Sequence, residues 1–257
     1  MRRVAVMLEY DGENFVGWQR QAVGVSVQSV LEKAASRLCG GSVAVACTAA
    51  GRTDSGVHAT GQVAHMDLPA HLDLLTIRDA LNFHMKPHAV AVLLAADVAD
   101  NWSARFSAIG RAYRYVIQTR RARLVLTRGQ AWHVDHPLDI AAMQDGARAL
   151  VGSHDFTSFR ASSCQAKSPF RTLDRLEVTQ EGDIVSIIAE ARSFLHHQVR
   201  NMVGTLKLVG EGKWSPAQVG MALDARARAA AGPTAPPDGL VLTGVVYPTD
   251  PFTMMAR

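Results

Sequence analysis

The feature that most constrains the fold is a pair of alternating segments separated by a tight turn. Apolar and polar residues alternate over residues 173–179 and again over residues 184–191, and Glu181-Gly182-Asp183 lies between them. Alternation with period two is typical of half-buried strands, and a short turn containing Gly joins antiparallel neighbours. The sequence therefore predicts a β-hairpin in the second half of the chain, and a sheet that is at least partly antiparallel.

Strands and helices are both expected elsewhere, and strands outnumber helices. Further strands are predicted over residues 4–10, 43–50, 60–68, 89–98, 112–119 and 240–247. Helices are predicted over residues 27–38, 74–81, 138–150 and 195–209, followed by a shorter one capped by Ser215-Pro216. Ser26 is the expected N-cap of the first helix. Residues 225–237, rich in Ala, Pro and Gly, are typical of a flexible connection.

These elements favour an α+β fold over a strict alternation of strand and crossover helix. Two similar halves are expected, each with a largely antiparallel sheet flanked by helices. The predicted boundary lies near Ser107, which gives an N-terminal half of residues 1–107 and a C-terminal half of residues 108–257. Because no Pro/Gly-rich linker or charge run marks this point, it stays open whether the two halves share one sheet.

Basic residues are concentrated in one stretch of the chain. The formal net charge is +4 and the sequence pI is about 9.2, which fits a polyanionic partner without requiring one. Residues 101–130 contain no Asp, Glu or Lys but seven arginines, Arg105, Arg111, Arg114, Arg120, Arg121, Arg123 and Arg128. Guanidinium groups suit phosphate oxygens, so this stretch is a candidate phosphate-contacting surface. An ordinary solvated basic face is the alternative.

Cysteine usage and hydropathy exclude two other classes of protein. The three cysteines, Cys39, Cys47 and Cys164, form no C-x-x-C pair, which argues against a disulfide framework and against a zinc site. No apolar run approaches the roughly 20 residues that span a bilayer. A cytoplasmic protein is therefore expected.

The most unusual segment is residues 50–63, Ala-Gly-Arg-Thr-Asp-Ser-Gly-Val-His-Ala-Thr-Gly-Gln-Val, which lies between two predicted strands. Glycines at Gly51, Gly56 and Gly61 allow a tight backbone and close ligand approach. Arg52 and Asp54 place a cation and a carboxylate two residues apart. On these residues alone Asp54 is a weak candidate for catalysis, because Asp-Ser-Gly is also an ordinary turn sequence.

The loop Gly-Arg-Thr-Asp-Ser-Gly-Val-His resembles the signature loop of the TruA family of tRNA pseudouridine synthases, and other motifs agree in the same order. They are Glu9-Tyr10-Asp11-Gly12, Gly17-Trp18-Gln19-Arg20-Gln21, Arg105-Phe106-Ser107-Ala108, Tyr113-Arg114-Tyr115, Asp155-Phe156-Thr157-Ser158-Phe159-Arg160, Phe194-Leu195-His196-His197-Gln198-Val199-Arg200-Asn201 and Gly239-Leu240. The matches extend from Glu9 to Tyr247, which is nearly the whole chain.

The resemblance implies a pseudouridine synthase fold with the catalytic cleft between the two halves, and an isomerase that works without a cofactor or metal. Its expected substrate is tRNA, at uridines 38, 39 and 40 of the anticodon stem-loop, and its expected state is a homodimer. The site residues that it implies are Asp54 as catalytic nucleophile, Arg200 as its basic partner, Tyr113 stacking on the target base, Arg52 gripping the RNA and Leu240 packing beneath the base.

Two other functions fit part of the pattern. A non-catalytic RNA-binding module would share the basic stretch and the aromatics, but it gains nothing from a carboxylate that repels phosphates. A glycosidase or nuclease would need a second acid or a metal cluster near Asp54 in the sequence, and neither is found. His196-His197 is not expected to hold a metal, because adjacent histidines on a predicted helix point apart. His58 is expected to hold loop backbone or to touch RNA.

Overall fold

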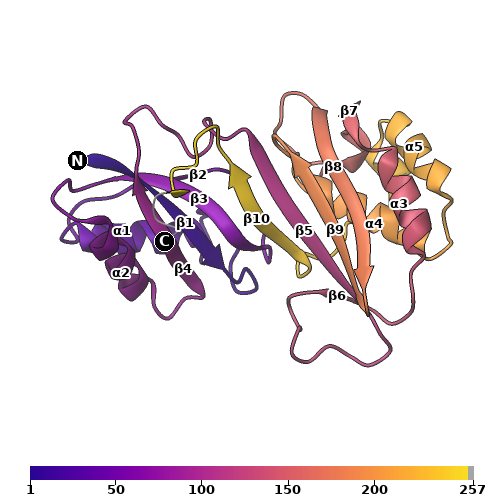
Figure 1. Cartoon of the computed structure of the whole chain (residues 1–257), viewed down its shortest axis with the longest axis horizontal. Coiled ribbons are helices and arrows are strands. Elements are labelled where there is room, and N and C mark those ends of the chain that lie inside the picture. The colour runs from indigo at the N-terminus through magenta and orange to yellow at the C-terminus, as the bar shows by residue number, and fades with distance from the viewer. Residues whose placement is uncertain (254–257) are drawn as a thin grey trace. The chain divides into compact units, whose positions relative to one another are not determined.

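The computed structural model describes residues 1–253, which form two compact units (Figure 1). The first unit contains Met1–Gly110 and the described residues from Leu242 onward, and the second contains Arg111–Val241. The last strand, β10 (Leu240–Val246), therefore begins in the second unit and ends in the first. Among the described residues, no helix combines the length and the apolar character needed to cross a bilayer.

The first unit is an antiparallel sheet with β1 at its centre. Its strands are β1 (Arg2–Tyr10), β2 (Thr48–Ala49), β3 (His58–Leu68) and β4 (Val90–Asp97), together with the end of β10 from Leu242. β1 pairs with β3 on one side and β4 on the other, and Tyr10 at its end lies opposite Ala59 and Val90. The end of β1 is thereby fixed next to the start of β3.

Two helices cover one face of this sheet, α1 (Val27–Leu38) and α2 (Leu74–Met85). Ser26 caps α1 as predicted, since its hydroxyl accepts the N–H of Ser29. An apolar cluster in this unit contains Ala5, Val63 and Ala96 from the strands, and Ala104 and Tyr247 from the segments that follow β4 and β10. Tyr247 donates a hydrogen bond from its hydroxyl to the Ala104 carbonyl, 2.8 Å away.

The second unit contains the predicted hairpin. Its strands are β5 (Gly110–Thr119), β6 (Trp132–Val134), β7 (Gly152–Asp155), β8 (Phe170–Glu181) and β9 (Ile184–Ala191). The antiparallel order is β5-β9-β8-β7, with β6 parallel to the end of β5. Gly182 takes φ of +60° between β8 and β9, a conformation that glycine adopts at little cost. The hairpin is confirmed.

The helices of the second unit pack together and against β8. They are α3 (Ile140–Arg148), α4 (Gln198–Gly210) and α5 (Pro216–Asp224), with 3-10 turns η1 (Thr157–Phe159) and η2 (Arg228–Ala230). α4 is the most buried helix, and its large buried apolar residues are Val199, Met202, Val203, Leu206 and Val209. The α+β class with largely antiparallel strands and flanking helices is confirmed.

Three local predictions were wrong. The strand expected over residues 43–50 is limited to Thr48–Ala49, because residues 41–47 run outside the sheet. His196 and His197 precede α4 instead of lying on it, and their ring centroids are 4.0 Å apart. Residues 225–237, expected to be flexible, are hydrogen-bonded to α4: Gly232 N–H donates to Thr205 and Thr234 Oγ1 donates to Asn201.

Candidate active site

Asp54 lies half-buried in the loop of residues 51–57, which we call the Asp54 loop, between β2 and β3. The Val57 N–H donates to the Asp54 carbonyl over 3.2 Å, so Asp54 opens a tight turn, and Gly56 takes φ of +79° within it. The far side of the turn is held by Phe15, whose carbonyl accepts from Gly56 N–H and from the Ser55 hydroxyl. The backbone of the loop is thus fixed from outside itself.

Thr53, the residue before Asp54, is held by a buried network of side-chain hydrogen bonds. Thr53 is buried, and its Oγ1 lies 2.8 Å from the Tyr10 hydroxyl, to which Gln62 Nε2 also donates. Gln62 Nε2 donates to the Gly51 carbonyl as well, over 2.9 Å. Burial raises the pKa of Tyr10 to about 12, so its hydroxyl keeps its proton at neutral pH. Tyr10, Thr53 and Gln62 were not predicted as site residues.

Glycines allow the chain after β1 to lie directly against the Asp54 loop. Residues 17–20, which we call the strap, meet it at Trp18, whose N–H donates to the Thr53 carbonyl over 3.0 Å. A Cβ on Gly17 would lie 2.7 Å from that same carbonyl oxygen, and Gly17 has φ of +100°. A Cβ on Gly12 would lie 2.1 Å from the Val57 carbonyl oxygen. The motifs of residues 9–12 and 17–21 therefore pack closely against the Asp54 loop.

His58 joins the end of β1 to the start of β3. It is buried, and its Nδ1 accepts the N–H of Gly12 over 3.1 Å and lies 3.1 Å from Asp11 Oδ1. This contact supports the interpretation that His58 holds loop backbone. Arg52 is exposed on the same loop, two residues before Asp54.

In the second unit, Tyr113 lies on β5 and is buried, with its ring edge-on to Phe194 at a centroid distance of 5.2 Å. Tyr115 lies two residues further on, so both tyrosines project from the same face of the strand. The Tyr115 hydroxyl donates to the Pro236 carbonyl over 2.8 Å, and burial raises the pKa of Tyr115. This face of β5 thus contacts the segment that leads into β10.

Arg200 and Leu240 are attached to the same segment. Arg200 Nε donates to the Ala235 carbonyl over 2.8 Å, and the Ala235 N–H donates back to the Arg200 carbonyl over 3.1 Å. Leu240 is buried at the start of β10, where its N–H donates to the Pro237 carbonyl. Arg200 and Leu240 therefore contact one segment of the second unit, which Tyr115 also reaches from β5, whereas Asp54 and Arg52 belong to the first unit.

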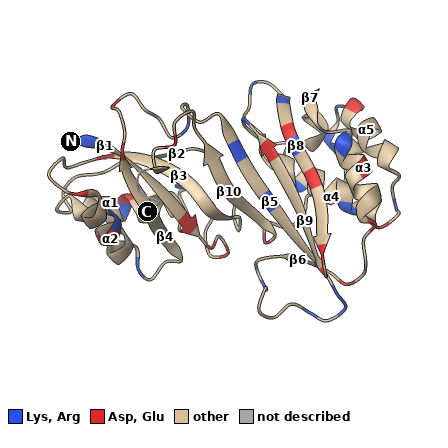
Figure 2. Cartoon of the chain, viewed as in Figure 1, with Lys and Arg blue, Asp and Glu red and all other residues tan. Residues whose placement is uncertain are grey.

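The arginine stretch is divided between structural and exposed residues. Arg111 is buried and donates to the Arg192 carbonyl over 2.7 Å, and Arg120 folds back on the carbonyls of Ala122 and Arg123. Arg111 alternates in phase with Tyr113 along β5, and both side chains are buried; that Arg111 contacts phosphate stays a prediction. The exposed members within the second unit are Arg114, Arg121, Arg123 and Arg128, three of them on the loop between β5 and β6 (Figure 2).

Comparison with known proteins gives consistent matches over most of the chain. A family described as tRNA pseudouridine synthase matches residues 6–107 and 147–248. A tRNA pseudouridine synthase A from Acidiphilium cryptum is 67% identical over 98% of this chain and 99% of its own length. Proteins of the same name from Paramagnetospirillum magneticum and Rhodospirillum rubrum are 62% and 54% identical, each over 96% of this chain and over 96% and 88% of their own lengths.

The first prediction concerns the close approach at Gly17. Gly41→Ala should cost about 1–2 kcal/mol, because Gly41 has φ of +82° but nothing within 4 Å of an added Cβ. Gly17→Ala adds a clash with the Thr53 carbonyl to a similar φ penalty, so it should cost roughly 3 kcal/mol or more. Denaturant unfolding of both variants measures the difference. Equal losses would show that the strap and the loop are not tightly packed.

The second prediction concerns the exposed arginines. Arg121→Gln with Arg123→Gln should flatten the dependence of log K on log salt for tRNA binding by roughly 0.7–0.9 per lost phosphate contact. Lys33→Gln with Arg37→Gln, both exposed on α1, changes the net charge equally and is the control. The same slope for the wild-type chain and the Arg121/Arg123 variant would exclude this loop from the RNA contact surface.

Proposed function

Because the chain belongs to the tRNA pseudouridine synthase family, we propose that it isomerises uridines of tRNA to pseudouridine, with Asp54 as the catalytic carboxylate. The observation that carries this assignment is the Asp54 loop. It holds a carboxylate in a fixed turn. Tyr10 and Gln62 hydrogen-bond to Thr53 and Gly51 of the loop, and the strap hydrogen-bonds to the Thr53 carbonyl. Proteins named tRNA pseudouridine synthase A share well over half of the sequence.

The chemistry requires few groups. The N1–C1′ bond of uridine breaks, the base turns, and C5 bonds to C1′; the hydrogen on C5 leaves to solvent, and N1 takes up a proton. No oxidant, reductant or energy source is consumed. Asp54 acts either as a nucleophile at C1′ or on a glycal route through C2′, and on both routes it must be ionised and desolvated when the base is in place.

We propose that the other candidate residues bind the RNA and the target base and orient the Asp54 carboxylate. A uridine in a stem must leave the stack before a protein group can reach its sugar. We assign stacking on the base to Tyr113, the grip on the RNA backbone to Arg52 and packing beneath the base to Leu240. Arg200 is assigned as the basic partner of Asp54, whose opposite charge holds and orients the carboxylate when the base is in place.

The finer identity of the substrate and the assembly are also proposals. The resemblance of the motifs to the TruA family supports uridines 38, 39 and 40 of the anticodon stem-loop as the targets, and a cytoplasmic homodimer that needs no cofactor. The exposed arginines of the β5–β6 loop provide charge complementarity to the tRNA phosphates. A purely binding role would leave Asp54 without a purpose, because its charge opposes RNA binding.

A third prediction tests Arg200. Arg200→Met should slow single-turnover pseudouridine formation by orders of magnitude and change the tRNA dissociation constant little, because Arg200 acts on Asp54. Arg200→Lys, which keeps a cation, should recover part of the rate. Arg228→Met is the structural control, because Arg228 donates to the Gly232 carbonyl and to Asn201 in the same region. If Arg200→Met kept a near-normal rate, the ion-pair assignment would be wrong.

A fourth prediction tests Asp54 itself. Asp54→Asn keeps the size and removes the charge, so the variant should fold, bind tRNA at least as well as the wild type, and form no pseudouridine. Tritium release from C5-labelled tRNA measures this directly, because the C5 hydrogen is lost as the new bond forms. Asp79→Asn, an exposed carboxylate on α2, is the control and should keep full activity. Tritium release by folded Asp54→Asn, free of wild-type enzyme and of deamidation, would exclude the mechanism.

A further inference from the structure

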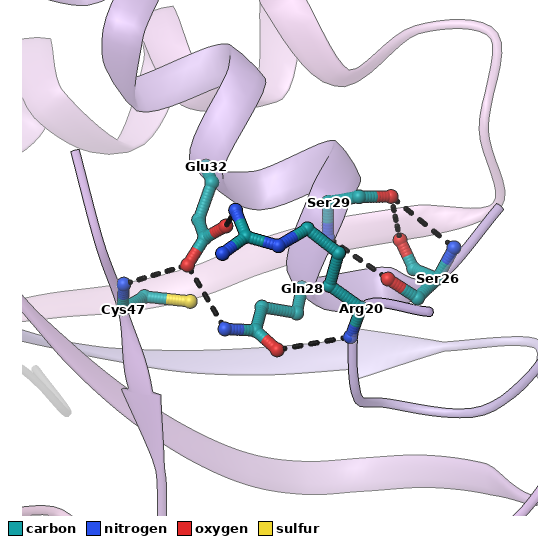
Figure 3. A network of polar contacts seen from close by, with 6 residues as sticks. All are labelled: Arg20, Ser26, Gln28, Ser29, Glu32 and Cys47. Carbon is teal, nitrogen blue, oxygen red and sulfur yellow. Dashed lines mark hydrogen bonds and ion pairs between the residues drawn. The ribbon is translucent and has the colours of Figure 1, made fainter. Parts of the chain in front are cut away.

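A buried carboxylate on α1 has no role in the function described so far. The Glu32 side chain is 8% exposed, and three donors surround it (Figure 3). Arg20 Nη1 lies 3.0 Å from Oε2, while Gln28 Nε2 and the Cys47 N–H donate to Oε1 over 2.9 and 3.0 Å. A carboxylate is costly to bury, and it is retained only where it is well paired. The segments to which its three partners belong therefore indicate what Glu32 stabilises.

Two of these partners connect Glu32 to the strap. Arg20 is the last residue of the strap, and its backbone N–H donates to Gln28 Oε1 over 3.0 Å (Figure 3). The strap also satisfies the first free N–H groups of α1, since Val27 N–H donates to the Gly17 carbonyl and Gln28 N–H to the Trp18 carbonyl. The strap is thus bound to the start of α1 along its length, and Glu32 and Gln28 hold its end.

The third partner connects Glu32 to the other side of the Asp54 loop. Cys47 directly precedes β2 (Thr48–Ala49), which leads into the loop, and the Cys47 N–H is held by the carboxylate. From the strap side, Trp18 N–H donates to the Thr53 carbonyl, the residue next to Asp54. One carboxylate therefore holds both the segment that enters the loop and the segment that packs against it.

We propose that Glu32, acting through Arg20 and Gln28, is a positioning residue for Asp54. This inference rests on the proposed function, because it needs Asp54 to be the catalytic carboxylate. Glu32 touches no substrate; it fixes the strap, and the strap fixes the Thr53 carbonyl. Small displacements of a catalytic group lower the rate far more than they lower binding. The network should therefore matter for turnover more than for tRNA affinity.

The test uses Glu32→Gln. The amide oxygen can still accept from Gln28 and Cys47, but the amide nitrogen replaces the oxygen that faces Arg20, so the variant breaks the strap contact selectively. Arg20→Met breaks the same contact from the other side. Asn82→Ala is the control, because Asn82 lies in the same unit but its two hydrogen bonds join α2 to the N–H and carbonyl of Val92 on β4. Each variant is measured for unfolding, tRNA dissociation constant and single-turnover rate.

Glu32→Gln and Arg20→Met should each lower the single-turnover rate by about 10- to 100-fold, with tRNA affinity nearly unchanged. The double variant should be no slower than the slower single variant, because both remove one interaction. Asn82→Ala should lose stability yet keep its rate while folded.

Two results would overturn the proposal. If Glu32→Gln, while folded, loses no more rate than Asn82→Ala, Glu32 contributes only to stability. If Arg20→Met instead weakens tRNA binding and flattens its salt dependence, Arg20 contacts RNA directly and is no positioning residue. Asp54→Asn measured in parallel separates these results from a failure of the proposed function, since residual activity in that variant would remove the premise itself.

Discussion

The contact between the strap and the Asp54 loop is the constraint on which the first unit depends. The Trp18 N–H reaches the Thr53 carbonyl only because residue 17 is a glycine, whose missing side chain leaves room for that carbonyl. The same strap satisfies the first N–H groups of α1 and is held at its end by Gln28. A turn carrying a carboxylate is thereby bound to a sheet on one side and to a helix on the other.

In the second unit, the segment beside Arg200 is held in the same way, by hydrogen bonds to a helix and by a close contact at a glycine. Residues 231–239, which precede β10, form no helix or strand. Thr205, Asn201 and Arg200 on α4 nevertheless all hydrogen-bond to this segment. Gly204 permits the close contact, because a Cβ there would lie 1.7 Å from the Pro233 carbonyl oxygen. In both units, a segment next to a proposed functional residue is fixed by hydrogen bonds to a helix and by a glycine at the point of closest approach.

Much of the fold followed from local sequence signals. The β8–β9 hairpin and the caps at Ser26 and Ser215 depend on residues close together in the chain, so their patterns are readable. Residues 43–47 have the composition of a strand but do not pair with another strand. Strand pairing depends on residues far away in the chain, so no local pattern reveals its absence here. His196 and His197 precede α4 because His197 takes φ of +61° and ends the regular backbone there.

For the site, the family motifs supplied the candidate residues but no role for the residues that support them, although Tyr10, Thr53 and Arg20 lie within those motifs. Glu32 looks like a solvated charge on an amphipathic helix until Arg20, Gln28 and Cys47 are seen around it. The burial of Arg111 does have a sequence signal, since Arg111 alternates in phase with the buried Tyr113 along β5.

We propose that this chain forms the pseudouridines of the anticodon stem-loop of tRNA. The most direct measurement is a map of pseudouridines in tRNA from cells that lack the protein, compared with the same cells after the wild-type chain is restored. If this proposal is right, pseudouridine at positions 38, 39 and 40 disappears without the protein and returns with it, while other pseudouridines stay. Unchanged pseudouridine at all three positions in cells that lack the protein would contradict it.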